Sequence, residues 1–250
     1  MGRLQGKRVL VTGAGGLLGS DLARGFAREG ADVVLTTRQG AKLAPLAAEL
    51  EALGVRCAAI AADFTSSGDI DRLADAAWEA FGGIDAVLLS SQPAEPMMGS
   101  LLDTDDADWD GQFQTIVRGP LRLMRALAPR MMAGGGGSVI ALTSSTGSEP
   151  TPGYGAYGLA KAGLWWLTCQ MAREWGAGGI RANAIQPGLI ATHGRLAEHE
   201  AMVRERGMLK RTSLDRVGAN ADCVGAAIYL ASDESAFVSG QMIRVDGGRF

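Results

Sequence analysis

Short apolar runs alternate with amphipathic stretches along nearly the whole chain. Residues 8–11 and 33–35 are β-branched runs typical of strands that are buried on both faces of a sheet. Between them, Leu18, Leu22 and Phe26 follow the spacing of one face of a helix. This segment therefore predicts a strand–helix–strand unit, the building block of a parallel sheet.

The same alternation continues to the end of the sequence. Further strands are predicted at residues 55–60, 86–89, 139–142, 180–185 and 242–245. Further helices are predicted at residues 42–53, 70–81, 108–132 with a kink at Pro120, 157–175 and 222–230. No repeat or linker divides the chain, so residues 1–250 predict one α/β domain of Rossmann type. We expect a doubly wound parallel sheet of about seven strands with helices on both faces.

Two irregular stretches interrupt this pattern, at residues 92–106 and 190–213. Long loops beside a rigid scaffold commonly carry binding residues, so both are candidate substrate loops. Methionines in both stretches suit a flexible apolar lid, and a contact between subunits is the alternative interpretation. They are Met97 and Met98 in the first stretch and Met202 and Met208 in the second.

Composition narrows the class of protein. Of the 250 residues, 47% are hydrophobic and 20% charged, which is enough apolar surface for a folded core. The net charge of −3 and the lack of basic clusters argue against nucleic acid and anionic membranes as partners. We find neither an apolar run of about 20 residues nor a signal-peptide pattern, so we expect a cytoplasmic protein without membrane contact.

The cysteines and histidines predict neither a disulfide framework nor a metal site. Cys57, Cys169 and Cys223 are odd in number and far apart, which favours reduced thiols. His193 and His199 lie near each other but have no carboxylate or cysteine partner at metal-ligand spacing. We therefore expect no bound metal.

A glycine-rich loop, residues 12–19, joins the first strand directly to the first helix. Glycines permit a tight turn there and let backbone N–H groups approach a pyrophosphate at the positive end of the helix. A purely structural turn is the alternative. The loop predicts a dinucleotide site, and its candidate residues are Gly13, Gly15, Gly16, Leu18 and Gly19.

The end of the second strand indicates which dinucleotide binds. The acidic residue that holds an adenosine ribose is absent, and Thr36, Thr37, Arg38 and Gln39 stand there instead. A guanidinium suits a 2′-phosphate, so Arg38 favours NADP(H) over the alternative NAD(H). Arg38 can also be an ordinary solvated residue of the loop.

Taken with the glycine loop, the run Tyr157-Gly-Leu-Ala-Lys161 resembles the short-chain dehydrogenase/reductase family. The resemblance extends from about residue 6 to residue 248 and includes Asp63, Ser144, residues 183–188, Thr192 and residues 239–248. It implies a seven-stranded Rossmann-type sheet and a tetramer or dimer. It also implies that a small-molecule carbonyl is reduced, or an alcohol oxidised, with a nicotinamide cofactor.

The catalytic roles follow from chemistry as well as from the resemblance. Lys161 lies four residues after Tyr157, on the same helix face, where its charge favours the phenolate of a tyrosine acid/base. Ser144 would donate a hydrogen bond to the substrate oxygen. An ordinary amphipathic pair on a helix is the alternative for Tyr157 and Lys161.

The resemblance also implies contacts with the two ends of the cofactor. Asp63 and Phe64 match the adenine-side contact, and Lys161 would also hold the nicotinamide ribose. The segment that contacts the nicotinamide carboxamide corresponds to Pro187, Gly188, Ile190 and Thr192.

The sequence departs from the family at three places. Leu17 stands where the second glycine is expected, residues 89–92 replace an Asn-Asn-Ala-Gly element, and Ile116 replaces a helix asparagine that holds a water in the proton relay. Isoleucine cannot hydrogen-bond, so Gln112, Gln114 or Thr115 substitutes, protons take another route, or catalysis is slow.

These departures leave two alternatives open. Enoyl-acyl-carrier-protein reductases also lack the last two elements, and Tyr154 stands at their tyrosine-to-lysine distance from Lys161. The chain is then a C=C reductase that uses Tyr154 and Lys161. The other alternative is an inactive, nucleotide-binding member that acts by regulation or assembly.

Overall fold

The computed structural model describes residues 2–93, 99–191, 196–205 and 207–249. Its centre is a sheet of seven strands in the order β3-β2-β1-β4-β5-β6-β9. The strands are β1 (Arg8–Thr12), β2 (Asp32–Thr37), β3 (Cys57–Ala61), β4 (Ala86–Leu89), β5 (Gly137–Leu142), β6 (Ile180–Pro187) and β9 (Met242–Val245). All neighbouring strands are parallel. The predicted parallel sheet is confirmed.

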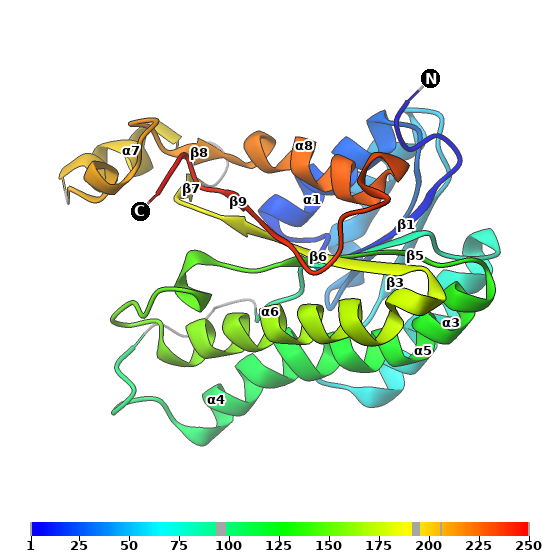
Figure 1. Ribbon diagram of the computed structural model, residues 1–250, viewed down its shortest axis with the longest axis horizontal. Helices are drawn as coiled ribbons and strands as arrows, with labels where there is room; N and C mark the ends of the chain where they lie inside the picture. The colour runs from blue at the N-terminus through cyan, green and yellow to red at the C-terminus, as the bar shows by residue number, and fades with distance from the viewer. Residues whose placement is uncertain (1, 94–98, 192–195, 206, 250) are drawn as a thin grey trace.

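Helices cover both faces of the sheet (Figure 1), with α1 and α8 on one face and α3, α5 and α6 on the other. The helices are α1 (Leu17–Arg28), α2 (Ala44–Glu51), α3 (Ser67–Phe81), α4 (Asp106–Phe113), α5 (Gly119–Ala133), α6 (Gly155–Trp175), α7 (Leu196–Glu205) and α8 (Asn220–Ala231). This is the doubly wound arrangement that the alternating pattern predicts.

The central strands are apolar on both faces because both faces are covered. In β1, Val9 and Val11 are buried in one hydrophobic cluster, with Phe26 of α1. Leu10 points the other way, into a second cluster with Leu73 of α3 and Leu127 of α5. Side chains alternate along a strand, so an uninterrupted apolar run fills two cores at once.

The long helix predicted at 108–132 is divided into α4, a π-helical segment (Gln114–Arg118) and α5. Pro120 explains the division, because proline lacks an N–H donor and its ring collides with the carbonyl four residues earlier in a regular α-helix. The wider π turn directly before Pro120 removes that collision. The interruption expected at Pro120 therefore takes the form of a π segment.

The stretch 190–213 is more ordered than its sequence indicates. It contains β7 (Ile190–Ala191), which pairs with β8 (Gly218–Ala219), and then α7. Among the described residues of this region, the buried apolar cluster consists of Ala191, Val203, Leu209 and Val217, so no long apolar stripe marks the helix. Met202 and Met208 are exposed here, whereas Met97 and Met98 lie outside the described residues.

The remaining expectations concern membranes, metals and thiols. No described helix is both long and apolar enough to span a bilayer. Within the described part of the chain, no group of acidic, histidine or cysteine side chains could hold a metal; His193 and the His199 side chain lie outside it. Cys57, Cys169 and Cys223 are free thiols.

Candidate active site

A cleft of about 600 Å³ opens at the carboxyl ends of the strands, where the strand order reverses between β1 and β4. Reversal points of this kind are the usual ligand sites of open α/β sheets. Most of the residues that the sequence singled out line this one cleft. They are Gly13, Gly15, Gly16, Leu18, Gly19, Arg38, Asp63, Phe64, Ser144, Tyr157, Lys161, Pro187 and Gly188.

The glycine loop has no room for larger side chains at two positions. Gly13 has a φ of +66°, and a Cβ there would lie 2.7 Å from the carbonyl oxygen of Ser90. A Cβ on Gly19 would lie 2.4 Å from the carbonyl oxygen of Gly13. Gly16 is the N-cap of α1 and has no side chain that could bind the free N–H groups of the helix. Gly16, Leu17 and Leu18 line the cleft, so the amino end of the helix lies at the cleft. The shape and the helix terminus fit a pyrophosphate.

Residues 89–92 hold the loop in place although they depart from the family element. The hydroxyl of Thr12 accepts hydrogen bonds from the backbone N–H groups of Ser90, at 2.9 Å, and Ser91, at 3.2 Å. The Ser90 hydroxyl donates to the backbone carbonyl of Thr12. Serines therefore join the ends of β1 and β4 beneath the cleft.

Two cations stand where the second strand ends. Arg38 and Lys42 are exposed and line the cleft beside Thr37. Within the described part of the chain, neither side chain has a hydrogen-bond or ion-pair partner. Sequence reasoning missed Lys42, although its position four residues after Arg38 could have indicated it.

Asp63 and Phe64 also line the cleft. The Asp63 carboxylate accepts hydrogen bonds from the backbone N–H and the hydroxyl of Thr65, at 2.8 and 2.7 Å. Phe64 packs so closely on Gly119 that a Cβ there would lie 2.8 Å from its ring. The wall is therefore rigidly joined to the start of α5.

Ser144, Tyr157 and Lys161 meet in the same cleft from two elements. Ser144 follows β5 and accepts a hydrogen bond from the Thr146 hydroxyl at 3.0 Å. Lys161 is only 1% exposed, and its Nζ donates to the Leu142 carbonyl at 2.8 Å. The same Nζ lies 5.5 Å from the centre of the Tyr157 ring.

Burial is the main cause of the pKa shifts of Tyr157 and Lys161. It raises the pKa of Tyr157 to about 12, and a hydrogen bond with Ser144 opposes that rise only in part. Burial also lowers the pKa of Lys161 to about 8. The Tyr157 pKa therefore lies above its usual range in this geometry, and the expected effect of the Lys161 charge on it stays a prediction.

The residues connected with the alternatives lie only partly in the cleft. The Tyr154 ring is 6.3 Å from that of Tyr157, but Tyr154 does not line the cleft. Ile116 is fully buried in an apolar cluster that includes Ala160. Of the residues that could replace the family asparagine, Thr115 lines the cleft, and Gln112 is buried with an oxygen, Oε1, that has no partner among the described residues.

The segment expected to contact the nicotinamide carboxamide lies only partly in this cleft. Pro187 and Gly188 line it, and the Gly188 N–H donates to the Val245 carbonyl at 2.9 Å. Ile190 instead lines a second cavity of about 250 Å³, beside Arg244 and Asp246. Thr192 lies outside the described residues.

Comparison with known proteins places this site in a family. Residues 13–249 match the sequence model of a family described as "Enoyl-(Acyl carrier protein) reductase". Dehydrogenase/reductase SDR family member 4 from Homo sapiens is 31% identical over 98% of this chain and 88% of its own.

Solved structures are similar over almost the full length. One is 7α-hydroxysteroid dehydrogenase complexed with NADH and 7-oxo glycochenodeoxycholic acid, with a TM-score of 0.90, 30% identity and 99% and 95% of the two chains covered. Another is gluconate 5-dehydrogenase from Burkholderia cenocepacia with NADP and tartrate, with a TM-score of 0.90, 31% identity and coverage of 98% and 96%. L-sorbose reductase from Gluconobacter frateurii, complexed with NADPH and L-sorbose, has a TM-score of 0.90, 27% identity and coverage of 100% and 99%. The chain therefore belongs to the short-chain dehydrogenase/reductase family of oxidoreductases.

Proposed function

We propose that this protein is an NADP(H)-preferring oxidoreductase that reduces a carbonyl group or oxidises a secondary alcohol. The observation that carries the proposal is the meeting of Ser144, Tyr157 and Lys161 in the cleft that the glycine loop also lines. A proton donor, a hydroxyl for the substrate oxygen and a buried amine thus face one site that suits a dinucleotide.

The chain offers a binding group for each part of the cofactor. The glycine loop and the amino end of α1 would hold the pyrophosphate, Asp63 and Phe64 the adenine end, and Lys161 the nicotinamide ribose. Pro187 and Gly188 of the cleft wall would hold the carboxamide. When bound, the nicotinamide supplies or accepts the hydride.

The proton chemistry belongs to the chain itself. Because burial raises its pKa to about 12, Tyr157 keeps its proton near neutral pH and can donate it to an alkoxide on the substrate. Ser144 orients and stabilises that oxygen. A charged Lys161 stabilises the phenolate left on Tyr157, and Thr115 lies in the cleft wall where it can return a proton through water.

Arg38 and Lys42 support the preference for NADP(H). Both line the cleft, are exposed and have no partner among the described residues, so both are available to a 2′-phosphate. Similar proteins were solved with either cofactor, NADPH for L-sorbose reductase and NADH for 7α-hydroxysteroid dehydrogenase. The preference therefore depends on this chain's own cations.

Reduction of a C=C bond is the second candidate. It is favoured by the description of the matching family and by the distance of Tyr154 from Lys161 along the chain. It requires Tyr154 to reach the substrate, whereas Tyr157 is the tyrosine in the cleft wall. A nucleotide-binding protein without redox activity is the third candidate. We also infer that the protein is cytoplasmic and forms a homo-oligomer, either a tetramer or a dimer.

The proposal is tested by titrating the purified protein with NADPH and NADH, and then assaying turnover. The substrate panel contains ketones, secondary alcohols and enoyl thioesters. Tight NADPH binding with turnover of ketones or alcohols is the expected result. Turnover of enoyl thioesters alone would transfer the assignment to C=C reduction, and binding without any turnover would favour the regulatory alternative.

A further inference from the structure

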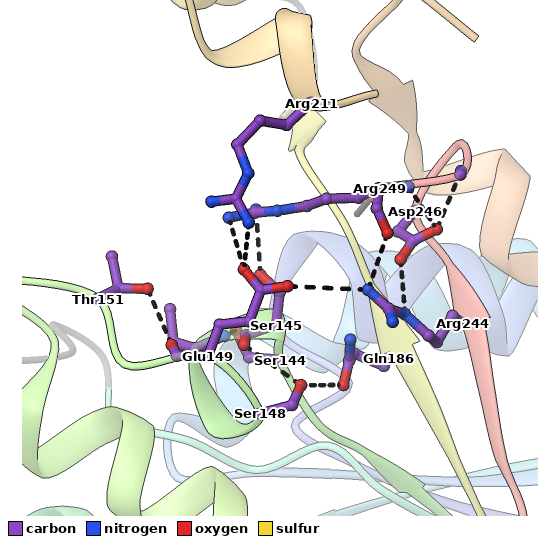
Figure 2. A network of polar contacts seen from close by, with 12 residues as sticks. Ser144, Ser145, Ser148, Glu149, Thr151, Gln186, Arg211, Arg244, Asp246 and Arg249 are labelled. Carbon is purple, nitrogen blue, oxygen red and sulfur yellow. Dashed lines mark hydrogen bonds and ion pairs between the residues drawn. The ribbon is translucent and has the colours of Figure 1, made fainter. Parts of the chain in front are cut away.

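Three arginines surround Glu149 beside the candidate active site (Figure 2). The Glu149 carboxylate lies 3.1 Å from Arg211, 3.4 Å from Arg249 and 3.9 Å from Arg244. Asp246 is the other carboxylate of this arginine cluster and pairs with Arg244 at 2.8 Å. The described part of the arginine cluster thus consists of three arginines and two carboxylates.

The arginine cluster is joined to the cleft wall through chain neighbours, although its own members do not line the cleft and Arg244 and Asp246 line the second cavity. Nη1 of Arg249 lies 3.4 Å from the hydroxyl of Ser145, the residue directly after Ser144. On the neighbouring strand, Gln186 precedes Pro187 of the cleft wall and accepts a hydrogen bond from the Ser148 hydroxyl at 2.6 Å. Figure 2 shows Arg211 and Arg249 reaching Glu149, with Arg249 also reaching Ser145 and with Ser148 turned towards Gln186.

Two donors here lack acceptors among the described residues. Gln186 is 1% exposed, and its Nε2 has no hydrogen-bond partner although its Oε1 is satisfied. Nε of Arg249 is also buried and unpaired. Leaving buried donors unpaired is unfavourable, and native proteins rarely do so unless a ligand or water supplies the acceptor. The site is therefore short of acceptor oxygens.

The ion pairs at Glu149 are also looser than structural pairs elsewhere in the chain. Two nitrogens of Arg122 donate hydrogen bonds to the Asp71 carboxylate, at 2.9 and 2.6 Å. Arg8 holds Asp85 in the same way, with both contacts at 2.8 Å. Tight, two-point contacts are typical of a guanidinium that has found its final carboxylate partner. Arg249 makes one long contact with Glu149 and keeps part of its donor capacity unused.

We propose that the arginine cluster is the subsite for a carboxylate of the substrate, so that the preferred substrates are oxo acids and the corresponding hydroxy acids. Arg249 binds the carboxylate, Arg211 adds charge, and the amide of Gln186 supplies a neutral donor. Ser144 and Tyr157 then receive the carbonyl a few atoms away. This inference rests on the proposed function, because it names the substrate class of the same site.

Glu149 has a defined part in this arrangement. Its carboxylate occupies the guanidinium groups between turnovers and competes with the incoming carboxylate for them. Removing its charge should therefore strengthen binding of an acid. If the cluster were only a structural clamp, the same change would weaken the site for every substrate.

The test compares acids with their uncharged esters. The probes are 2-oxo, 3-oxo, 4-oxo and 5-oxo carboxylic acids, each paired with its methyl ester, and kcat/KM is measured with NADPH. Calorimetric binding of each pair to the NADP⁺-loaded enzyme gives a readout that requires no turnover. The variants are Arg249→Gln, Arg249→Lys, Glu149→Gln and the control Arg122→Gln, each checked by thermal melting.

We expect at least one acid to exceed its ester about tenfold or more. Arg249→Gln should reduce kcat/KM for that acid by about tenfold to a hundredfold through KM, and change the ester less than about threefold. Arg249→Lys should keep part of the preference, and Glu149→Gln should increase it. Arg122→Gln should have no effect.

Three results would overturn the inference: no acid is preferred over its ester, Arg249→Gln weakens acid and ester alike, or Glu149→Gln weakens both. If the esters and neutral ketones are reduced without any preference for acids, the proposed function stands and only the carboxylate subsite is lost. If no carbonyl compound is reduced, the proposed function fails, and the binding of acid against ester still decides the subsite.

Discussion

The ammonium group of Lys161 lies 5.5 Å from the centre of the Tyr157 ring, one turn away along α6. Lys161 is fully buried, its Nζ donates to a backbone carbonyl, and no carboxylate contributes to its pKa shift. Burying a charged amine without a carboxylate partner is unfavourable, and groups of this kind are common at functional sites.

Replacing Lys161 with methionine should stabilise the protein while removing activity. Lowering of the lysine pKa from 10.5 to about 8 corresponds to about 3 kcal/mol of unfavourable burial below pH 8. After loss of the hydrogen bond to Leu142, Lys161→Met should gain about 1–2 kcal/mol in the free energy of unfolding. Because the folded-state pKa is depressed, this gain should shrink as pH rises from about 8 towards 10.5. Urea unfolding of both proteins at pH 7 and pH 10 measures this gain. A Lys161→Met variant that is less stable than the unsubstituted protein at pH 7 would contradict the prediction.

The two directions of the reaction should respond oppositely to pH. Reduction needs protonated Tyr157 and charged Lys161, so its kcat/KM should be level below pH 8 and fall about tenfold per pH unit above it. Alcohol oxidation needs the phenolate of Tyr157 together with charged Lys161, so it should rise about tenfold per unit up to pH 8. Above pH 8 it should level off, because the loss of charged Lys161 cancels the gain in phenolate. Initial rates between pH 6 and pH 10 test this. A reduction rate that increases with pH would be inconsistent with Tyr157 as the acid.

Two tyrosines three residues apart provide a matched test of the reaction type. Tyr157→Phe should reduce ketone reduction by about 10²–10⁴-fold and leave NADPH binding unchanged, because only the acid is lost. Tyr154→Phe should change the rate by less than about threefold, since Tyr154 does not line the cleft. Greater damage from Tyr154→Phe, measured on an enoyl thioester, would support C=C reduction instead.

Local patterns predicted the sheet, because each central strand is short, apolar and bounded by glycines or polar residues. Val9, Leu10 and Val11 show this, since each is buried and they fill two cores in alternation. The glycine loop was equally predictable, because its steric demands act within a few residues. Ser144, Tyr157 and Lys161 were found through spacing together with the family resemblance, and the strand order brings them together.

Features that depend on distant contacts could not be predicted. Helix α7 rests on Val203 and a few partners from other segments, so its own sequence shows no stripe. The pKa of Tyr157 is raised by burial among residues from several elements, which spacing along the chain does not reveal. The carboxylate of Glu149 and its arginines are separated by up to 100 residues.

The glycine loop should tolerate no side chain at residue 19. In Gly19→Ala the new Cβ would lie 2.4 Å from the Gly13 carbonyl oxygen, so the loop backbone must shift. NADPH affinity should fall about tenfold or more, as a displaced N–H group loses its phosphate contact. Gly225→Ala in α8 is the control, because its Cβ meets nothing within 4 Å. It should raise stability by about 0.5–1 kcal/mol and leave NADPH affinity unchanged. Equal affinities in the two variants, by fluorescence titration, would refute the account of the loop.

Arg38→Asp should move cofactor preference from NADPH towards NADH. An aspartate repels a 2′-phosphate and accepts hydrogen bonds from a ribose diol. The substitution should therefore weaken the binding of NADPH and strengthen the binding of NADH. The ratio of kcat/KM for NADPH to that for NADH should fall about 10²-fold or more, and Lys42→Ala should lower it by a smaller factor because it removes charge without adding repulsion. Arg125→Asp is the control, since Arg125 is exposed on α5 and does not line the cleft. An unchanged ratio in Arg38→Asp would show that the guanidinium does not contact the 2′-phosphate, and preference would then have to come from Lys42 alone.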